Sequence, residues 1–381
     1  MKREGHLIER VAEMDNLLLA FYKAQKGKSG KKEVCAYRSC LQDNLLRMRN
    51  GLLTGEAAVG RYHTFTIYDP KERQIYAAAF EERVLHHALM NVCHPYFEKH
   101  LIDDTYATRR GKGTYAALER AHKSIAHYQY VAKLDVRKYF DSINHDILKE
   151  QLSRLFKDPL LVKVFNKILD ACHGSCPDVG LPIGNLTSQY FANHYLSVLD
   201  HYVKEQAQVV SYVRYMDDML LFADDRQSLK RQVGMVDMYL RSNLKLHIKP
   251  PIIVSTDQGV SFLGYRLQGH RIGLNSRSRN RYKRKMNLYG RLLETGRWNQ
   301  EDYRVHVQPL NAFTAHAYSK KFRTRVIKSQ AAGLEPRESW WQLEQQCQEL
   351  PRFESQQQHS LEPQQQSWFP CGFGPQLMDS K

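Results

Sequence analysis

Hydrophobic and polar positions alternate with two different periods along the first hundred residues. Apolar side chains recur every three or four positions from residue 7 to residue 24, which predicts a first helix, and the basic, Gly-rich stretch 26–32 predicts a loop after it. Residues 62–68 and 75–79 alternate in strand fashion and predict a β-hairpin. A mainly apolar stretch over 82–96 predicts a buried helix.

The pattern becomes mixed after residue 130. Strand-like apolar runs at 131–136, 209–213, 219–223 and 260–266 are separated by helical stretches at 144–155, 186–206 and 226–242. Residues 276–328 are basic and helical in character, and the chain becomes Gln-rich and poor in aliphatic residues after about residue 330. We therefore predict an α+β fold with a disordered C-terminal tail.

Charge narrows the function classes. Lys and Arg number 56 against 40 Asp and Glu, which gives a net charge of +16, and 42% of the residues are hydrophobic. A core with so basic a surface suggests a polyanionic partner, either nucleic acid or an anionic membrane surface. No apolar run reaches the roughly 18 residues of a membrane span, and the N-terminus lacks the apolar core of a signal peptide. With seven scattered cysteines as well, we expect a cytoplasmic protein with reduced thiols and no membrane partner.

Paired carboxylates lie between two apolar runs, at Tyr215-Met216-Asp217-Asp218. Such a pattern is typical of a β-hairpin with a polar turn, where adjacent carboxylates repel each other. A solvated turn tolerates that repulsion, whereas a catalytic role requires a cation to share the charge. The neighbouring pair Asp224-Asp225 precedes a helical stretch and is better suited to a helix N-terminus.

A third carboxylate, Asp135, ends the apolar run 131–135. An acid within an apolar strand is costly unless it is paired or binds metal. If this strand lies beside the 209–223 hairpin, Asp135 faces Asp217, and their oxygens are suited to two Mg²⁺ ions roughly 4 Å apart. The alternative is that Asp135 caps a helix that begins near residue 137.

Several segments in this order resemble the reverse transcriptase family, over residues 61 to 325. The resemblance implies a right-hand polymerase fold after an N-terminal helical extension at 1–60. Its parts would be fingers at 61–130, a palm with the catalytic aspartates at 131–268 and a basic helical thumb at 269–328, followed by the Gln-rich tail at 329–381. Asp135, Asp217 and Asp218 would be catalytic, and would bind metal together with Val136.

The same resemblance implies residues around the incoming nucleotide. Arg109 and Lys112, in the segment Tyr106–Thr114, correspond to basic residues that hold the triphosphate. Phe140, five positions after Asp135, corresponds to the aromatic residue that excludes a ribose 2′-hydroxyl, although simple core packing is the alternative. Lys249 matches a general acid for pyrophosphate, with Lys245 as a second candidate.

Other residues would contact the primer and template by the same resemblance. Tyr215 and Met216 precede the paired aspartates, and Phe262-Leu263-Gly264-Tyr265 resembles the primer-grip turn. The segment 310–319 resembles a thumb helix that follows the minor groove and includes His316. Backbone phosphates would be bound by the basic residues Arg279, Arg281, Lys283, Arg284 and Lys285.

The segment Gly180–Gln189 refines the resemblance. Most reverse transcriptases have Gln-Gly-x-x-x-Ser-Pro here, whereas this chain has Ile183 before Gly184 and Gln189 after Ser188. This form is similar to the enzymes of diversity-generating retroelements of bacteria and phages, which make frequent errors opposite template adenine. Replacing a glutamine with isoleucine removes a polar contact to the new base pair, which lowers discrimination. A neutral packing variant at Ile183 is the alternative.

The resemblance also implies cofactors and partners. We expect two Mg²⁺ ions, with Mn²⁺ as a substitute, and as ligands a template RNA, a cDNA or primer, and dNTPs. A small, basic, oligomeric accessory protein would accompany the enzyme, which we expect to be cytoplasmic and encoded by a bacterium or a phage. The alternatives are a retron-like or antiphage-defence reverse transcriptase and, more remotely, a catalytically silent RNA-binding protein.

Overall fold

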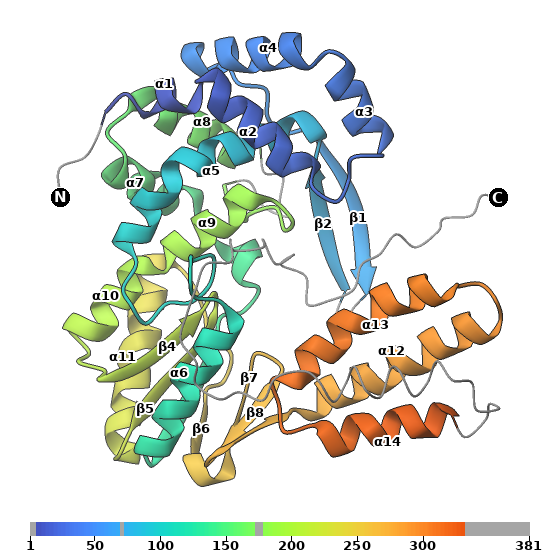
Figure 1. Cartoon of the computed structure of the whole chain (residues 1–381). Coiled ribbons are helices and arrows are strands. Elements are labelled where there is room, and N and C mark those ends of the chain that lie inside the picture. The colour runs from blue at the N-terminus through green and yellow to red at the C-terminus, as the bar shows by residue number, and fades with distance from the viewer. Residues whose placement is uncertain (1–4, 69–71, 172–177, 332–381) are drawn as a thin grey trace. The chain divides into compact units, whose positions relative to one another are not determined.

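The computed structural model describes residues 5–68, 72–171 and 178–331, and their mixture of helices and sheets confirms the predicted α+β class (Figure 1). The described chain forms two compact units. The first contains the residues up to Arg109, Ala132–Leu221 and Arg226–Ile252. The second contains Arg110–Val131, Phe222–Asp225 and the residues from Ile253 onwards.

Helices make up the N-terminal part of the first unit: α1 (Leu7–Val11), α2 (Met14–Gln25), α3 (Lys32–Ser39), α4 (Leu41–Thr54) and α5 (Phe80–His100). The single helix predicted over residues 7–24 is wrong, because the backbone is extended at Glu13. The Asn16 side chain donates a 2.8 Å hydrogen bond to the Val11 carbonyl, which satisfies an acceptor at the end of α1. The predicted buried helix over 82–96 is confirmed as part of α5.

The predicted hairpin is confirmed as strands β1 (Tyr62–Tyr68) and β2 (Glu72–Ala78). They pair antiparallel, with Tyr62 opposite Ala78. The backbone N–H of Tyr76 in β2 donates to the Ile183 carbonyl at 3.0 Å. The hairpin is therefore bonded to the segment that carries the altered motif.

A four-stranded sheet has the order β4 (Ser211–Tyr215), β5 (Asp218–Ala223), β3 (Tyr130–Asp135) and β6 (Ile252–Ser255). Its middle strands follow the predicted apolar runs, and Met219, Leu220 and Leu221 are buried. The chain around the sheet also forms a short 3₁₀ turn η1 (Tyr139–Ser142) and the helices α7 (His145–Leu155), α8 (Pro159–Asp170), α9 (Leu186–Tyr195), α10 (Ser197–Glu205) and α11 (Arg226–Leu244).

The second unit combines a small sheet with helices. Helix α6 (Thr114–His127) precedes the 3₁₀ turn η2 (Thr256–Gln258), strands β7 (Val260–Phe262), β8 (Tyr265–Gln268) and β9 (Arg271–Leu274), and helices α12 (Ser276–Glu294), α13 (Gln300–Ala315) and α14 (Lys320–Ala331). The last three helices share an apolar cluster of Tyr282, Met286, Tyr289, Tyr303, Val307, Leu310 and Val326.

The predicted single strand at 260–266 is wrong. It is a tight hairpin, with Phe262 paired to Tyr265 across a two-residue turn. Leu263 and Gly264 both have positive φ, at 47° and 90°, which is the backbone that such turns require.

The predicted disorder after residue 330 concerns a segment that lies outside the described residues, apart from the end of α14. Among the helices that the structure describes, none combines the length and the apolar character that a membrane span needs.

Candidate active site

The sheet order brings the predicted carboxylates onto neighbouring strands. Asp135 is the last residue of β3, Asp218 is the first residue of β5, and β3 lies directly beside β5. Asp217 occupies the turn between β4 and β5, after Met216, whose φ is 54°. The expectation that the strand of Asp135 lies beside the 209–223 hairpin is therefore confirmed, and the helix-cap alternative for Asp135 is not, because the residue belongs to a strand.

Two lysines form ion pairs with two of these three carboxylates. Lys249 Nζ lies 2.6 Å from Asp135 Oδ1, and the Lys249 backbone N–H donates to the Asp135 carbonyl at 2.8 Å. Lys133, two residues before Asp135 on β3, lies 3.2 Å from Asp218 Oδ1. Lys245, the other candidate, is exposed and its ammonium donates to the Ser242 carbonyl at 3.1 Å. Of the two lysines considered as the general acid, Lys249 is thus the one that lies at the carboxylates.

Electrostatic repulsion and burial act together on the turn. Burial and, to a smaller extent, the charges of Asp218 and Asp135 together raise the pKa of Asp217 to about 7. Burial also raises the pKa of Asp218, although Lys133 opposes the shift. Carboxylates that repel one another in a half-buried site favour a bound cation.

The donor set fits a divalent cation in its chemistry. Asp135, Asp217 and Asp218 supply hard oxygen donors, the kind that Mg²⁺ and Mn²⁺ prefer. Within the described ranges, however, no group of three or more His, Cys, Asp or Glu side chains is arranged to hold a metal ion. The positive charges beside Asp135 and Asp218 come instead from Lys249 and Lys133. Val136, predicted to contribute to the metal site, is buried and forms a bridge to Ile248.

The segment that carries Ile183 is hydrogen-bonded both to Phe140 and to the β1–β2 hairpin. The Leu181 backbone N–H donates to the Phe140 carbonyl at 2.7 Å, and the Ile183 carbonyl accepts from Tyr76 at 3.0 Å. Phe140 itself is half-buried in η1. Gly184 has a φ of 114°, and a Cβ at this position would lie 3.1 Å from Ile75 Cγ2. This close approach of loop and hairpin explains the glycine.

Polar atoms without partners gather at the beginning of α9. Asn185 Nδ2, Thr187 Oγ1 and Gln189 Oε1 are buried and make no hydrogen bond in the described structure. The Asn185 Oδ1 atom accepts from the Ala78 N–H at 3.3 Å. Buried polar atoms are nearly always satisfied, so unpaired atoms here are consistent with a ligand or water beside Gln189.

Arg109 does not reach outward. Its Nε lies 2.8 Å from Glu98 Oε1, its Nη1 atom donates to the Thr105 carbonyl at 3.0 Å, and only 8% of its side chain is exposed. A guanidinium used in this way holds its own loop together, so this geometry does not support the predicted triphosphate contact. Lys112 is half-buried and belongs to the second unit.

In the second unit, the four residues of the predicted primer-grip turn differ in their exposure to solvent. The Phe262 and Tyr265 side chains are fully buried, and the Tyr265 hydroxyl donates to the Phe313 carbonyl at 2.7 Å. Leu263 and Gly264, at the tip, are half-buried. A Cβ on Gly264 would lie 3.0 Å from Phe313 and from Ser278. Of the four residues, only the two at the tip have any exposure with which to contact a nucleic acid.

The predicted phosphate-binding residues of α12 also differ in exposure. Arg279, Lys283 and Arg284 are exposed, Arg281 is half-buried and Lys285 is buried. Arg279 and Lys283 lie over the Phe322 ring, at 5.0 and 5.9 Å from its centre. His316 stacks on Tyr115, with ring centres 3.4 Å apart. Helix α14 carries further exposed basic residues, which were not among the predicted site residues: Lys320, Lys321, Arg325 and Lys328.

Two further residues at the carboxylates were also missed. Lys133 occupies an alternate position of an otherwise apolar strand, a signal comparable with that of Asp135. Arg214, inside the buried strand β4, is fully buried. Asp224 and Asp225, in contrast, are exposed and directly precede α11, as expected for a helix N-terminus.

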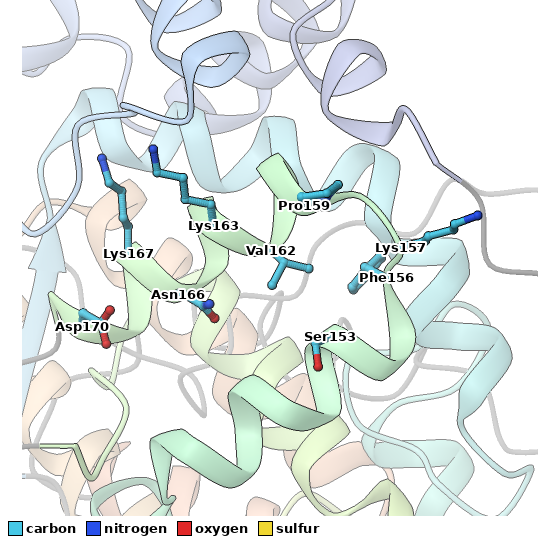
Figure 2. A pocket seen from close by; sticks show the side chains of 9 residues that line it. All are labelled: Ser153, Phe156, Lys157, Pro159, Val162, Lys163, Asn166, Lys167 and Asp170. Atoms are coloured by element: carbon cyan, nitrogen blue, oxygen red, sulfur yellow. The ribbon is translucent and has the colours of Figure 1, made fainter.

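A groove on the first unit lies apart from these residues. It has a volume of about 510 Å³ and is lined by parts of α7 and α8 and of the segment between them, including Phe156 and Val162 (Figure 2). Lys163 and Lys167 on its border pair with Glu56. None of the predicted site residues lines this groove.

A hairpin that presents adjacent aspartates beside a strand ending in a third is the arrangement expected of a metal-dependent nucleotidyl-transfer centre. The comparisons make the class specific. Residues 69–267, more than half of the chain, match the family model for reverse transcriptase (RNA-dependent DNA polymerase). The chain therefore belongs to the reverse transcriptase family, as the resemblance of its motifs implied.

Similarity to individual proteins is low. The putative COX1/OXI3 intron 1 protein of Saccharomyces cerevisiae is 21% identical over 68% of this chain and 32% of its own length. Protein YkfC of Escherichia coli is 22% identical over 57% of this chain and 70% of its own length. The chain thus spans about a third of the yeast protein.

Among solved structures, telomerase of Candida albicans in complex with a telomeric RNA fragment is similar at 10% identity and a TM-score of 0.47, over 79% of this chain and 68% of that one. Apo telomerase of Candida tropicalis is similar at 10% identity and a TM-score of 0.45, over 63% and 54%.

Proposed function

We propose that this protein is an RNA-directed DNA polymerase that copies a template RNA into cDNA. The observation that carries the proposal is that Asp135 and Asp218 lie on adjacent strands, with Asp217 in the turn directly before Asp218, in a member of the reverse transcriptase family. All three carboxylates are present, together with the lysines that pair with two of them. A catalytically silent RNA-binding protein would not need these carboxylates.

Each residue at the site has a role in this proposal. Asp135, Asp217 and Asp218 would hold two divalent cations, which supply charge for a nucleotidyl transfer when bound. The ammonium of Lys249, beside Asp135, would hold a proton for the leaving pyrophosphate. Phe140 would exclude a ribose 2′-hydroxyl, and Ile183 with Gln189 would shape the space around the new base pair.

The right-hand domains belong to the same proposal. The fingers would comprise residues 61–130, the palm 131–268 and the thumb 269–328, after an N-terminal extension at 1–60. The exposed basic residues of α12 and α14 would bind backbone phosphates in the thumb, and the tip at Leu263-Gly264 would contact the primer strand. Arg109 would act by holding its loop, and Lys112 would contact the triphosphate.

The finer proposal is a diversity-generating reverse transcriptase with frequent errors at template adenines. It is supported by Ile183 in place of the usual glutamine and by the bond from Tyr76 that fixes the backbone at this position. An aliphatic side chain offers the base pair shape without a hydrogen bond, which removes about 1–3 kcal/mol of selectivity. The template RNA, dNTPs and a small basic accessory protein are the partners of this proposal.

The test is primer extension on RNA with Mg²⁺ or Mn²⁺, followed by sequencing of the cDNA. Asp217→Asn should abolish metal-dependent extension, because it removes a carboxylate from the site. Asp224→Asn is the matched control, since Asp224 is an exposed member of an adjacent-aspartate pair outside the site. Equal activity of the two variants would contradict the proposal.

The errors in the cDNA decide the finer proposal. Errors concentrated at template adenines would support the diversity-generating reading, and Ile183→Gln should then reduce them. Accurate copying of adenines would be compatible with the polymerase function, but would favour a retron-like or antiphage-defence enzyme over a diversity-generating one. Failure to extend any primer, after template RNA and an accessory protein have been supplied, would favour the silent RNA-binding protein.

A further inference from the structure

A buried ion pair lies directly behind the turn that carries the paired aspartates. The Arg214 and Asp200 side chains are both 0% exposed, and Arg214 Nε lies 2.7 Å from Asp200 Oδ1. Arg214 is in β4 and Asp200 is in α10. Burying two charges is expensive, and apolar residues of the same volume are often as stable or more so. Core packing therefore does not require this pair.

The guanidinium of Arg214 is fully occupied. Nη2 donates to the second oxygen of Asp200 and, at 3.2 Å, to the Asn193 carbonyl. Nη1 donates to Asn193 Oδ1 at 2.9 Å and to the Met216 carbonyl at 3.2 Å. With the Nε contact, every N–H donor of the group has an acceptor. The group is thus held rigidly between α9, α10 and the turn.

The contact with Met216 is the one that reaches the aspartates. The Met216 carbonyl belongs to the peptide group whose nitrogen is that of Asp217. Met216 has a φ of 54°, a left-handed conformation that a residue with a long side chain rarely adopts without support. The hydrogen bond from Arg214 holds this peptide group in place, and the orientation of the peptide determines where Asp217 and Asp218 project.

The backbone of Arg214 is equally constrained. Its N–H donates to the Asp104 carbonyl and its carbonyl accepts from Tyr106, both at 3.0 Å. The Asn193 side chain, in turn, donates to the Ala107 carbonyl at 2.9 Å. The guanidinium therefore acts from a fixed strand on a strained turn.

We propose that Arg214 is a positioning residue, whose buried guanidinium sets the Met216–Asp217 peptide group and with it the geometry of the paired aspartates. The proposal rests on the proposed polymerase function for its kinetic consequence, but not for its structural one. Lysine cannot replace arginine here, because one ammonium cannot satisfy Asp200 and also reach Asn193 and Met216.

The test compares Arg214→Lys with Tyr195→Phe. The first variant retains a cation beside Asp200 and loses the contact with Met216. The second removes one buried hydrogen bond, from the Tyr195 hydroxyl to the Leu244 carbonyl at 2.7 Å, and does not touch Arg214. We would measure kcat and KM for dNTP, Mn²⁺ binding by electron paramagnetic resonance without nucleotide, and melting temperature.

For Arg214→Lys we expect kcat to fall by about 100-fold with KM for dNTP little changed, because a carboxylate misplaced by about 1 Å costs that much. Mn²⁺ binding should weaken about tenfold or more, as it does when groups that orient metal ligands are removed. Tyr195→Phe should lower the melting temperature and leave kcat and Mn²⁺ binding as in the wild type.

Retention of both kcat and Mn²⁺ binding by Arg214→Lys would overturn the proposal, as would equal losses in Tyr195→Phe. If Arg214→Lys does not fold, Asn193→Ala loosens the guanidinium while keeping its pair with Asp200, and should weaken Mn²⁺ binding in the same direction. Unchanged binding in that variant would then overturn the proposal. A wild type that binds Mn²⁺ but extends no primer would contradict the polymerase function alone, because the binding comparison still tests Arg214.

Discussion

At the scale of the residue, the candidate site is a balance of charges. Three carboxylates lie at neighbouring strand ends, and two lysines compensate Asp135 and Asp218. Among the residues that the structure describes, Asp217 forms no such ion pair, and its pKa is raised to about 7 by burial and by its acidic neighbours. Lys133 and Lys249 therefore mark the two positions at which the site accepts positive charge beside its carboxylates.

The two lysines considered as general acids give a matched pair of variants. Lys249→Gln should lower kcat for primer extension by about 100-fold, because it removes a proton donor and the partner of Asp135. Lys245→Gln should leave kcat unchanged, since the Lys245 side chain is exposed and bonds to its own helix end. Steady-state kinetics on RNA checks both, and equal effects would contradict the assignment of Lys249.

At the scale of the element, α9 joins the site to the core. It begins beside the Ile183 loop with buried, unpaired polar atoms and continues into the buried residues Phe191, Ala192 and Asn193. His194 near its end is buried between Phe97 and His100, with ring centres 5.4 and 5.0 Å away. A helix that holds both Asn193 and His194 in the core has little freedom to move.

The burial of His194 predicts acid sensitivity. Burial lowers the pKa of His194 to about 3, from an ordinary value of 6.5, and the charge of His100 acts in the same direction. Between these two pKa values, His194 is protonated in the unfolded chain and neutral in the folded chain. The free energy of unfolding is therefore not reduced by His194 above pH 6.5, and it decreases as the pH falls below that value, by up to about 1.4 kcal/mol per pH unit.

Denaturant unfolding of the wild type and of His194→Gln, measured from about pH 7.5 down to about pH 4.5, checks this expectation. The variant should lose less of its free energy of unfolding across that range, because an amide does not titrate. The same acid-induced loss in both proteins would show that His194 is not the responsible group.

At the scale of the whole molecule, the net charge of +16 is the dominant property. Part of this charge lies on exposed residues of α12 and α14. Neighbouring basic residues of α12 differ in exposure, since Arg284 is exposed and Lys285 is buried. Cations that neutralise phosphates release counterions, which makes binding weaken as salt rises.

Salt dependence of binding to a primer–template therefore tests the basic surface. We expect a slope of log K against log salt steeper than about −3 for the wild type. Arg284→Gln should reduce the magnitude of the slope by about 1, and the buried Lys285→Gln should not. Fluorescence anisotropy at several salt concentrations measures all three slopes. A shallow wild-type slope, or equal slopes for the two variants, would contradict a phosphate-binding role for exposed residues of α12.

Local pattern by itself determined much of this protein. The hairpin at residues 62–78, the strand before Asp135, the turn at Asp217 and Asp218 and the order of the family motifs follow from side-chain periodicity and residue type within short windows. The breaks at Glu13 and Leu263 were missed, because they depend on single backbone conformations that a hydrophobic pattern does not record.

Tertiary structure alone decided which of these pieces meet. The order of strands placed Asp135 beside Asp218, and other long-range contacts brought Lys249 to a residue 114 positions away and joined the Ile183 loop to β2. It also buried Arg214 behind the aspartates and turned Arg109 inward to Glu98. Contacts between distant residues depend on strand order and on competition for buried hydrogen-bond partners, and neither is encoded in the local alternation of apolar and polar side chains.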